Sequence, residues 1–145
     1  MDIAPLEAHR HHATTESRPI SYLDVGGGRP AVFIHGLIAN SLLWRHVISE
    51  VASEQRRCIA VDLPGHGHTP AAPAHADVSL TGLAKRVIEL VDQLGLDRFD
   101  LVANDTGGAF AQIVAAHAGE MLSTLTRSIF RRARSATTRG SARQC

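Results

Sequence analysis

Short, mainly apolar runs that end in polar loops constrain the fold of this chain more than any other feature. They are residues 31–34 (AVFI), 58–61 (CIAV) and 99–102 (FDLV). Apolar runs of about four to eight residues that stop at glycine, aspartate or histidine are typical of strands buried inside a sheet. Stretches with apolar residues at helical spacing separate these runs, at Ser41–Ala52, Leu80–Leu94 and Ala109–Ala118.

Strands that alternate with helices need crossover connections between parallel neighbours. The sequence therefore predicts an α/β protein with a doubly wound, mostly parallel sheet. Further strands are expected at residues 19–25 and 122–126. The 145 residues suffice for one domain, which we place at residues 19–126 behind a polar N-terminal segment, residues 1–18.

The amphipathic helix Leu80–Leu94 carries the strongest helical pattern. Ser79 is the expected N-cap and Gly95 the expected residue just beyond the C-terminal end. Its apolar positions form one face, and Arg86 is assigned to the opposite, polar face.

Signals for export and membrane insertion are not found in the sequence. The N-terminus lacks the basic and apolar regions of a secretory signal, and no apolar run approaches the about 18–20 residues of a membrane span. Cys58 and Cys145 form no disulfide framework. These features predict a cytoplasmic protein with no membrane partner.

Charge divides the chain near Arg127. All 14 acidic residues lie at or before Glu120, whereas residues 127–145 contain six arginines and no acidic residue. The hydrophobic pattern breaks at the same place, so we interpret residues 127–145 as a disordered or out-of-frame tail. The alternative is a genuine basic arm that binds a polyanion. Nucleic acid is the less favoured partner, because the tail lacks helical amphipathicity and interleaved aromatic residues.

The loops that follow the apolar runs hold the candidate site, because ligands bind at the carboxyl edge of an open parallel sheet. Asp105 is the central residue of the third loop. Ala103 and Gly107, two positions before and after it, are small enough to permit a tight turn between a strand and a helix. Such a turn lifts the side chain of residue 105 into the cleft.

The sequence around these loops resembles the N-terminal half of an α/β-hydrolase-fold enzyme, over residues 19–126. The resemblance rests on PAVFIHGLIANSLLWRHV, CIAVDLPGHGHTP and DLVANDTGGAFAQIVAAH. Most members carry serine in the turn, whereas Asp105 is characteristic of the haloalkane dehalogenase and epoxide hydrolase branch. The family therefore implies an aspartate nucleophile that forms a covalent alkyl ester with a small-molecule substrate.

The resemblance also assigns roles to neighbouring residues. Backbone N–H groups of Leu37 and Thr106 would form the oxyanion hole. The residues that would shape the loops are His35, Gly36, Asp62, Ala103 and Gly107. No cofactor is implied. No metal site is predicted either, because His66 and His68 have ligand spacing without further ligands nearby in the sequence.

The sequence departs from the family in the site and in length. Thr106 replaces the tryptophan that follows the nucleophile in the family, and Leu37 replaces a common asparagine. The sequence therefore does not identify the leaving group of the substrate. A complete enzyme has about 250–300 residues, with a cap and a base histidine supplied by later loops. His117 lies along a helix ~18 Å from Asp105 and does not replace that base. We therefore expect a chain truncated before the cap and the C-terminal strands, and inactive.

The alternative function is a non-catalytic α/β module whose arginine-rich tail binds polyanions. The oligomeric state is open.

Overall fold

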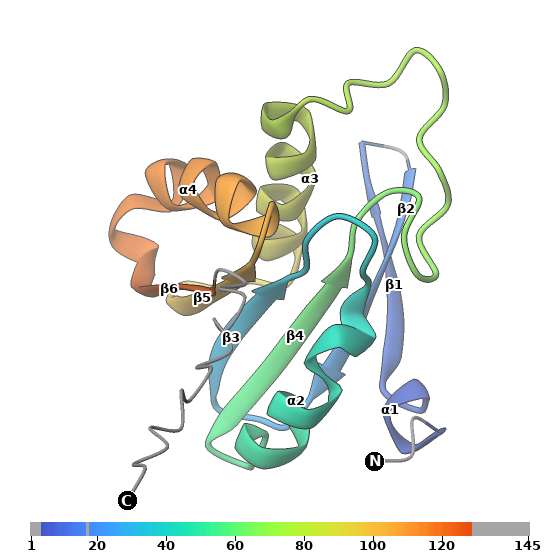
Figure 1. The fold of residues 1–145 in the computed structure, drawn as a ribbon. Coiled ribbons are helices and arrows are strands. Elements are labelled where there is room, and N and C mark those ends of the chain that lie inside the picture. The colour runs from blue at the N-terminus through green and yellow to red at the C-terminus, as the bar shows by residue number, and fades with distance from the viewer. Residues whose placement is uncertain (1–3, 17, 129–145) are drawn as a thin grey trace, which may run out of the picture.

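The computed structural model describes residues 4–16 and 18–128. Within these residues, six strands form one mixed sheet in the order β1-β2-β4-β3-β5-β6 (Figure 1). Their bounds are Arg10–Thr15 (β1), Arg18–Val25 (β2), Arg29–Ile34 (β3), Arg56–Asp62 (β4), Phe99–Asn104 (β5) and Leu122–Ser128 (β6). The strands β4, β3, β5 and β6 run parallel to one another, whereas β2 pairs antiparallel with both β4 and β1. The predicted fold class is confirmed.

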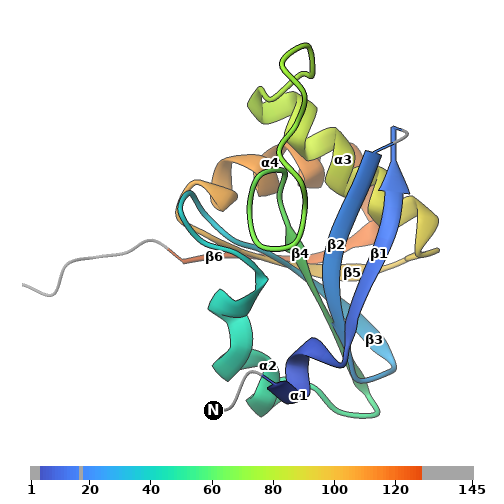
Figure 2. The same cartoon turned by 90° about the vertical axis from the view of Figure 1, so that its right-hand side faces the viewer.

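Helices cover both faces of the sheet. The helices α3 (Leu80–Gln93) and α4 (Gly107–Ala118) lie on one face, and α1 (Ala4–Glu7) and α2 (Arg45–Val51) lie on the other (Figures 1 and 2). Short 3₁₀ turns precede α2, at Ser41–Trp44, and follow α4, at Gly119–Met121. The predicted helix Ser41–Ala52 therefore begins as a 3₁₀ turn, which the side chain of Asn40 caps by accepting from the Leu42 amide.

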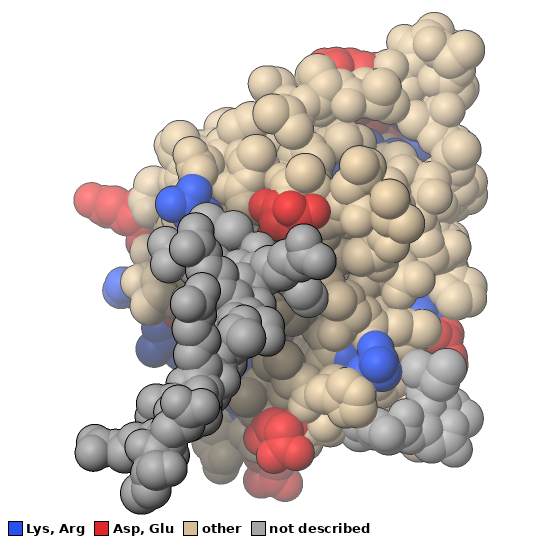
Figure 3. Space-filling model, in the orientation of Figure 1, with Lys and Arg blue, Asp and Glu red and all other residues tan. Residues whose placement is uncertain are grey.

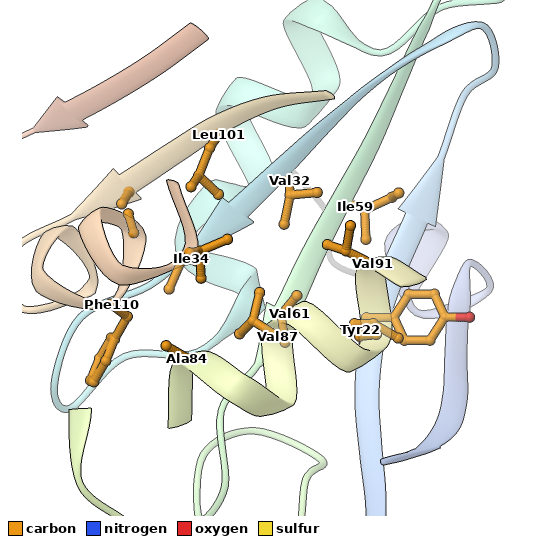
Figure 4. Packing of buried hydrophobic residues seen from close by; sticks show 14 of the residues in the cluster. Tyr22, Val32, Ile34, Ile59, Val61, Ala84, Val87, Val91, Leu101 and Phe110 are labelled. Atoms are coloured by element: carbon orange, nitrogen blue, oxygen red, sulfur yellow. The ribbon is translucent and has the colours of Figure 1, made fainter. Parts of the chain in front are cut away.

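Alternate residues of the central strands divide the core into two clusters. Val32, Ile34, Ile59 and Val61 pack against α3 and α4 (Figure 4). Phe33, Cys58 and Ala60, one position along the same strands, pack with Trp44 and Ile48 on the other face. Because both faces are buried, residues 31–34 of β3 and 58–61 of β4 are continuously apolar, which is the pattern that the sequence shows.

The ends of α3 follow from its sequence. Ser79 accepts a hydrogen bond from the Gly82 amide, and Gly95 has a φ of 64° just beyond the helix. Both predicted caps are confirmed.

The polar segment 1–18 contains a strand that the sequence analysis did not predict. The strand β1 pairs antiparallel with β2 at the edge of the sheet. Only Thr15 in it is fully buried, so β1 shows no alternation of apolar and polar residues. An edge strand that faces water on one side can stay polar, which explains why the sequence predicts only a polar segment here.

Arg86 corrects a second expectation. It was assigned to the polar face of α3, but the structure buries it. Its guanidinium donates to Thr15 Oγ1 at 2.9 Å and to the Pro19 carbonyl at 2.7 Å. These bonds attach α3 to the β1–β2 hairpin and satisfy the buried charge.

The last described strand extends slightly past the predicted domain boundary. Arg127 and Ser128 pair with Ala103 and Asn104 of β5, and the rest of the predicted tail lies outside the described residues.

On the face seen in Figure 3, the Lys and Arg side chains drawn in blue are scattered rather than gathered in one patch. None of the helices described here has the length and apolar character needed to cross a membrane.

Candidate active site

The loops after β3, β4 and β5 meet at one edge of the sheet. Ile34 at the end of β3 lies level with Val61 of β4 and Ala103 of β5, so the residues that follow emerge side by side. A Cβ atom at Gly36 would lie 2.8 Å from Asp105 Cβ and 3.0 Å from Asp105 Oδ2. The first loop therefore touches the third, and only glycine fits at the contact.

Asp105 occupies a sharp turn between β5 and α4. Its φ of 51° lies in the left-handed region, which few residues other than glycine adopt. The turn is held by hydrogen bonds from the Asp105 amide to the Ser128 carbonyl at 3.0 Å and from the Gly108 amide to the Asp105 carbonyl at 2.9 Å. The residue is exposed, so this constrained backbone presents a carboxylate at the edge of the sheet.

The small residues beside Asp105 are required by packing. Ala103 is fully buried, and a Cβ atom at Gly107 would lie 2.5 Å from the His35 carbonyl oxygen. The sequence analysis selected both as residues that permit a tight turn. The structure adds that Gly107 permits the close approach of the first loop.

The Leu37 amide and the Thr106 side chain are joined directly. The Leu37 N–H donates to Thr106 Oγ1 over 2.7 Å. Gly36, Leu37 and Thr106 line a cavity of about 60 Å³ whose remaining wall is mainly apolar and comes from Leu63, His66, Leu83 and Phe110. Leu37 and Thr106, the two residues predicted to stabilise an oxyanion, are thus adjacent. However, the Thr106 hydroxyl accepts the hydrogen bond of the Leu37 amide.

His35 connects the first two loops. It is fully buried, its Nε2 accepts from the Leu63 amide at 3.0 Å, and its Nδ1 donates to the Gly36 carbonyl at 2.7 Å. An acceptor at Nε2 and a donor at Nδ1 define a neutral ring. Burial lowers the pKa of His35, which favours the same neutral form. With both nitrogens engaged, His35 positions the loops and does not act as a base.

Asp62 organises the second loop from a fully buried position. Its Oδ1 accepts from the Ser41 amide at 2.6 Å. Its Oδ2 accepts from the His68 amide at 3.0 Å and from Arg10 Nη1 at 2.8 Å. Sequence reasoning missed Arg10, because its segment was left outside the domain and carries no motif.

The other histidines near these loops hold no metal-like arrangement. His66 Nδ1 lies 3.0 Å from the Pro64 carbonyl oxygen, and His68 Nδ1 lies 3.9 Å from Asp62 Oδ2. Over residues 4–16 and 18–128, no three His, Cys, Asp or Glu side chains gather as metal ligands do. His117 lines a hollow beside Phe99, which begins β5, whereas Asp105 follows the end of that strand.

The sequence pattern of the α/β-hydrolase fold matches residues 30–127, which include all three loops. The chain belongs to the α/β-hydrolase fold family. Among curated relatives, the chain is 32% identical over 102 residues to epoxide hydrolase 2 of Siraitia grosvenorii, covering 69% of this chain and 32% of the relative. It is 38% identical over 88 residues to a fluoroacetate dehalogenase of Burkholderia, covering 58% and 29%.

Solved structures agree with this assignment. The epoxide hydrolase CorEH, in a structure without ligand, superposes on 83% of this chain with a TM-score of 0.75 and 30% identity. The match covers 42% of that structure. The chain thus spans about a third of the curated relatives that it matches.

Proposed function

We propose that this α/β-hydrolase chain supplies the nucleophile of an epoxide hydrolase or dehalogenase type of reaction, and that Asp105 is that nucleophile. The observation that carries the proposal is the exposed carboxylate on a left-handed turn, in contact with Gly36, at the carboxyl edge of the sheet. Relatives named as an epoxide hydrolase and a fluoroacetate dehalogenase support the same class of chemistry.

The first step is displacement at a saturated carbon. One carboxylate oxygen of Asp105 attacks the carbon and forms an ester bond, while the bond to the leaving group breaks with its electron pair. With an alkyl halide the halide ion leaves. With an epoxide the ring opens and its oxygen takes a proton from water. A carboxylate is already ionised at neutral pH, so this step needs no general base.

The second step is hydrolysis of that ester. Water attacks the Asp105 carboxyl carbon and creates an oxyanion, which the Leu37 and Thr106 backbone amides would stabilise once Thr106 Oγ1 releases the Leu37 amide.

A base must activate the water. His35 has both nitrogens engaged. His66, in the cavity wall, has its Nδ1 at the Pro64 carbonyl oxygen and no carboxylate among the described residues to orient it as a base, and His117 lies toward the opposite end of β5. We therefore expect the ester to accumulate on this chain rather than turn over.

The walls beside the turn indicate the kind of substrate. Leu63, Leu83 and Phe110 give the cavity an apolar lining, and its volume of about 60 Å³ holds only a few atoms. A small apolar substituent beside the electrophilic carbon fits there. Neither step of the proposed reaction requires a cofactor.

The test is covalent labelling by styrene oxide, followed by intact-mass spectrometry and peptide mapping. The chain carries Cys145→Ala to remove a reactive thiol, while Cys58 is buried and burial raises its pKa to about 11. One added epoxide per chain is expected at Asp105. The Asp105→Asn variant should remain unlabelled, whereas Asp97→Asn, the same change at another exposed aspartate, should label normally. Equal labelling of all three proteins would remove the case for Asp105.

A further inference from the structure

We propose that the Thr106 hydroxyl caps the Leu37 amide in the resting site, so that only an anionic oxygen displaces it. The hydroxyl lies 2.7 Å from the Leu37 nitrogen, within the range of a strong hydrogen bond. An amide has a single proton to donate. While Thr106 accepts it, the Leu37 amide is not available to a ligand. The catalytic consequence rests on the proposed function of Asp105, whereas the cap itself does not.

The side chain of Thr106 gives up its usual local partner to make this contact. Thr106 is the N-cap residue of α4, and a threonine there normally accepts from an amide in the first turn of its own helix. Here the side chain makes no such bond, and the residue itself has helical dihedral angles, with φ of −60° and ψ of −24°. The hydroxyl reaches across to the β3 loop instead, so the contact is not a by-product of capping.

The loop that carries Leu37 is held in an unusual shape. Ile38 has a φ of 62°, a conformation that is rare for a β-branched residue, and its side chain is 93% exposed. No burial of Ile38 offsets this strain. Strained backbone of this kind persists where the surrounding structure fixes it, and it clusters at ligand sites. This strained residue directly follows Leu37, whose amide donates to Thr106 Oγ1.

The charge of the incoming oxygen decides whether the cap opens. A hydrogen bond from an amide to an ionised oxygen is about twice as strong as one to a neutral oxygen. A neutral ester carbonyl therefore gains little by replacing the hydroxyl, whereas the oxyanion of a tetrahedral intermediate gains much more. Thr106 is exposed, so its side chain can rotate to another staggered position without moving the core. The cap thus leaves the Leu37 amide available only to the oxyanion of the tetrahedral intermediate, which is the species that catalysis must stabilise.

The test measures the Leu37 amide by NMR in the full 145-residue chain. Thr106→Val removes the hydroxyl and keeps the shape, and Thr106→Ser keeps the hydroxyl. Solvent exchange of the Leu37 amide should be about fivefold faster in the Val variant than in the parent or the Ser variant. This factor corresponds to the loss of a net hydrogen bond of about 1 kcal/mol. Unchanged exchange in the Val variant would overturn the proposal.

A formate titration tests access to the amide. It is performed in an Asp105→Asn background, because an ionised carboxylate beside the amide would repel the anion. The Leu37 signal should shift at about fivefold lower formate concentration when Thr106→Val is added. An equal response with and without Thr106→Val, including no response in either, overturns the cap. If the Val variant loses its dispersed spectrum, Thr106→Ala replaces it in both measurements.

The two proposals fail separately. Absence of labelling at Asp105 by styrene oxide removes the nucleophile and leaves the exchange and titration results intact. If Thr106→Val does not change the solvent exchange of the Leu37 amide, the cap is refuted and the labelling result still stands.

Discussion

Two aspartates follow strands that flank β3, and the protein uses them in opposite ways. Asp62, at the end of β4, is fully buried and accepts from Ser41, His68 and Arg10. Asp105, after β5, is exposed on a left-handed turn whose hydrogen bonds involve its backbone. A carboxylate saturated with donors is a poor nucleophile, because its lone pairs are engaged. The comparison separates a buried carboxylate that holds the loops together from an exposed one that we propose as the nucleophile.

The largest expected effect follows from removing the supporting carboxylate. Asp62→Ala leaves the buried Ser41 amide, the His68 amide and the Arg10 guanidinium without this acceptor. We expect a loss of about 3 kcal/mol in the free energy of unfolding, at the low end for a broken buried pair because Glu7 still pairs with Arg10. Urea denaturation measures it. Asp105→Asn should change the same quantity by less than about 0.5 kcal/mol. Similar losses in both variants would refute the contrast.

The next effect concerns the space around the turn at Asp105. Gly107→Ala places a methyl group 2.5 Å from the His35 carbonyl, a backbone atom that cannot move away cheaply. We expect a loss of about 2 kcal/mol in the free energy of unfolding, together with loss of styrene oxide labelling. Gly95→Ala is the matched control. Its methyl group meets nothing within 4 Å, so only its left-handed backbone is penalised, by about 1 kcal/mol, and labelling should persist. Normal labelling of the Gly107→Ala variant would contradict this account.

A smaller effect isolates the backbone strain at Asp105. Glycine tolerates the φ of 51° there, and alanine does not. Asp105→Gly should therefore be more stable than Asp105→Ala by about 1 kcal/mol, measured by urea denaturation, although neither variant can be alkylated at this position. Equal stabilities would mean that the turn carries no strain at residue 105.

The smallest effect is a pH dependence from His35, which spans the two loops. Burial lowers its pKa in the folded state, so the unfolded chain takes up the proton first. Stability from this group is complete above about pH 6.5, the usual histidine pKa, and falls as the pH drops below it. Protonation would also remove the acceptor at Nε2 for the Leu63 amide. His35→Asn should flatten the loss of stability between pH 7 and pH 5, and an unchanged slope would exclude His35 as its source.

Local sequence patterns were enough to predict the central strands, α3, α4 and the small residues at the reactive turn. These features depend on neighbours along the chain. The apolar runs mark β3, β4 and β5, and Ala103 and Gly107 mark the turn by their size. The family resemblance then supplied roles for Asp105, Leu37 and Thr106, and those roles remain proposals.

Contacts between distant residues could not be predicted in the same way. Arg10 and Asp62 are 52 positions apart, and Arg86 and Thr15 are 71 apart. Charged residues in such pairs resemble ordinary surface residues until the fold brings them together. The bond between Leu37 and Thr106 could not be predicted for the same reason, because it joins two residues that are 69 positions apart.

The strand order has a consequence for how the chain assembles during synthesis. Residues 10–62 contain four adjacent strands, β1, β2, β4 and β3, together with Arg10, His35 and Asp62. The strand β5 joins afterwards at the open edge beside β3, and β6 then joins beside β5, so neither must enter between strands that are already paired. As the nascent chain leaves the ribosome, the support of the cleft can therefore form before Asp105 has been translated.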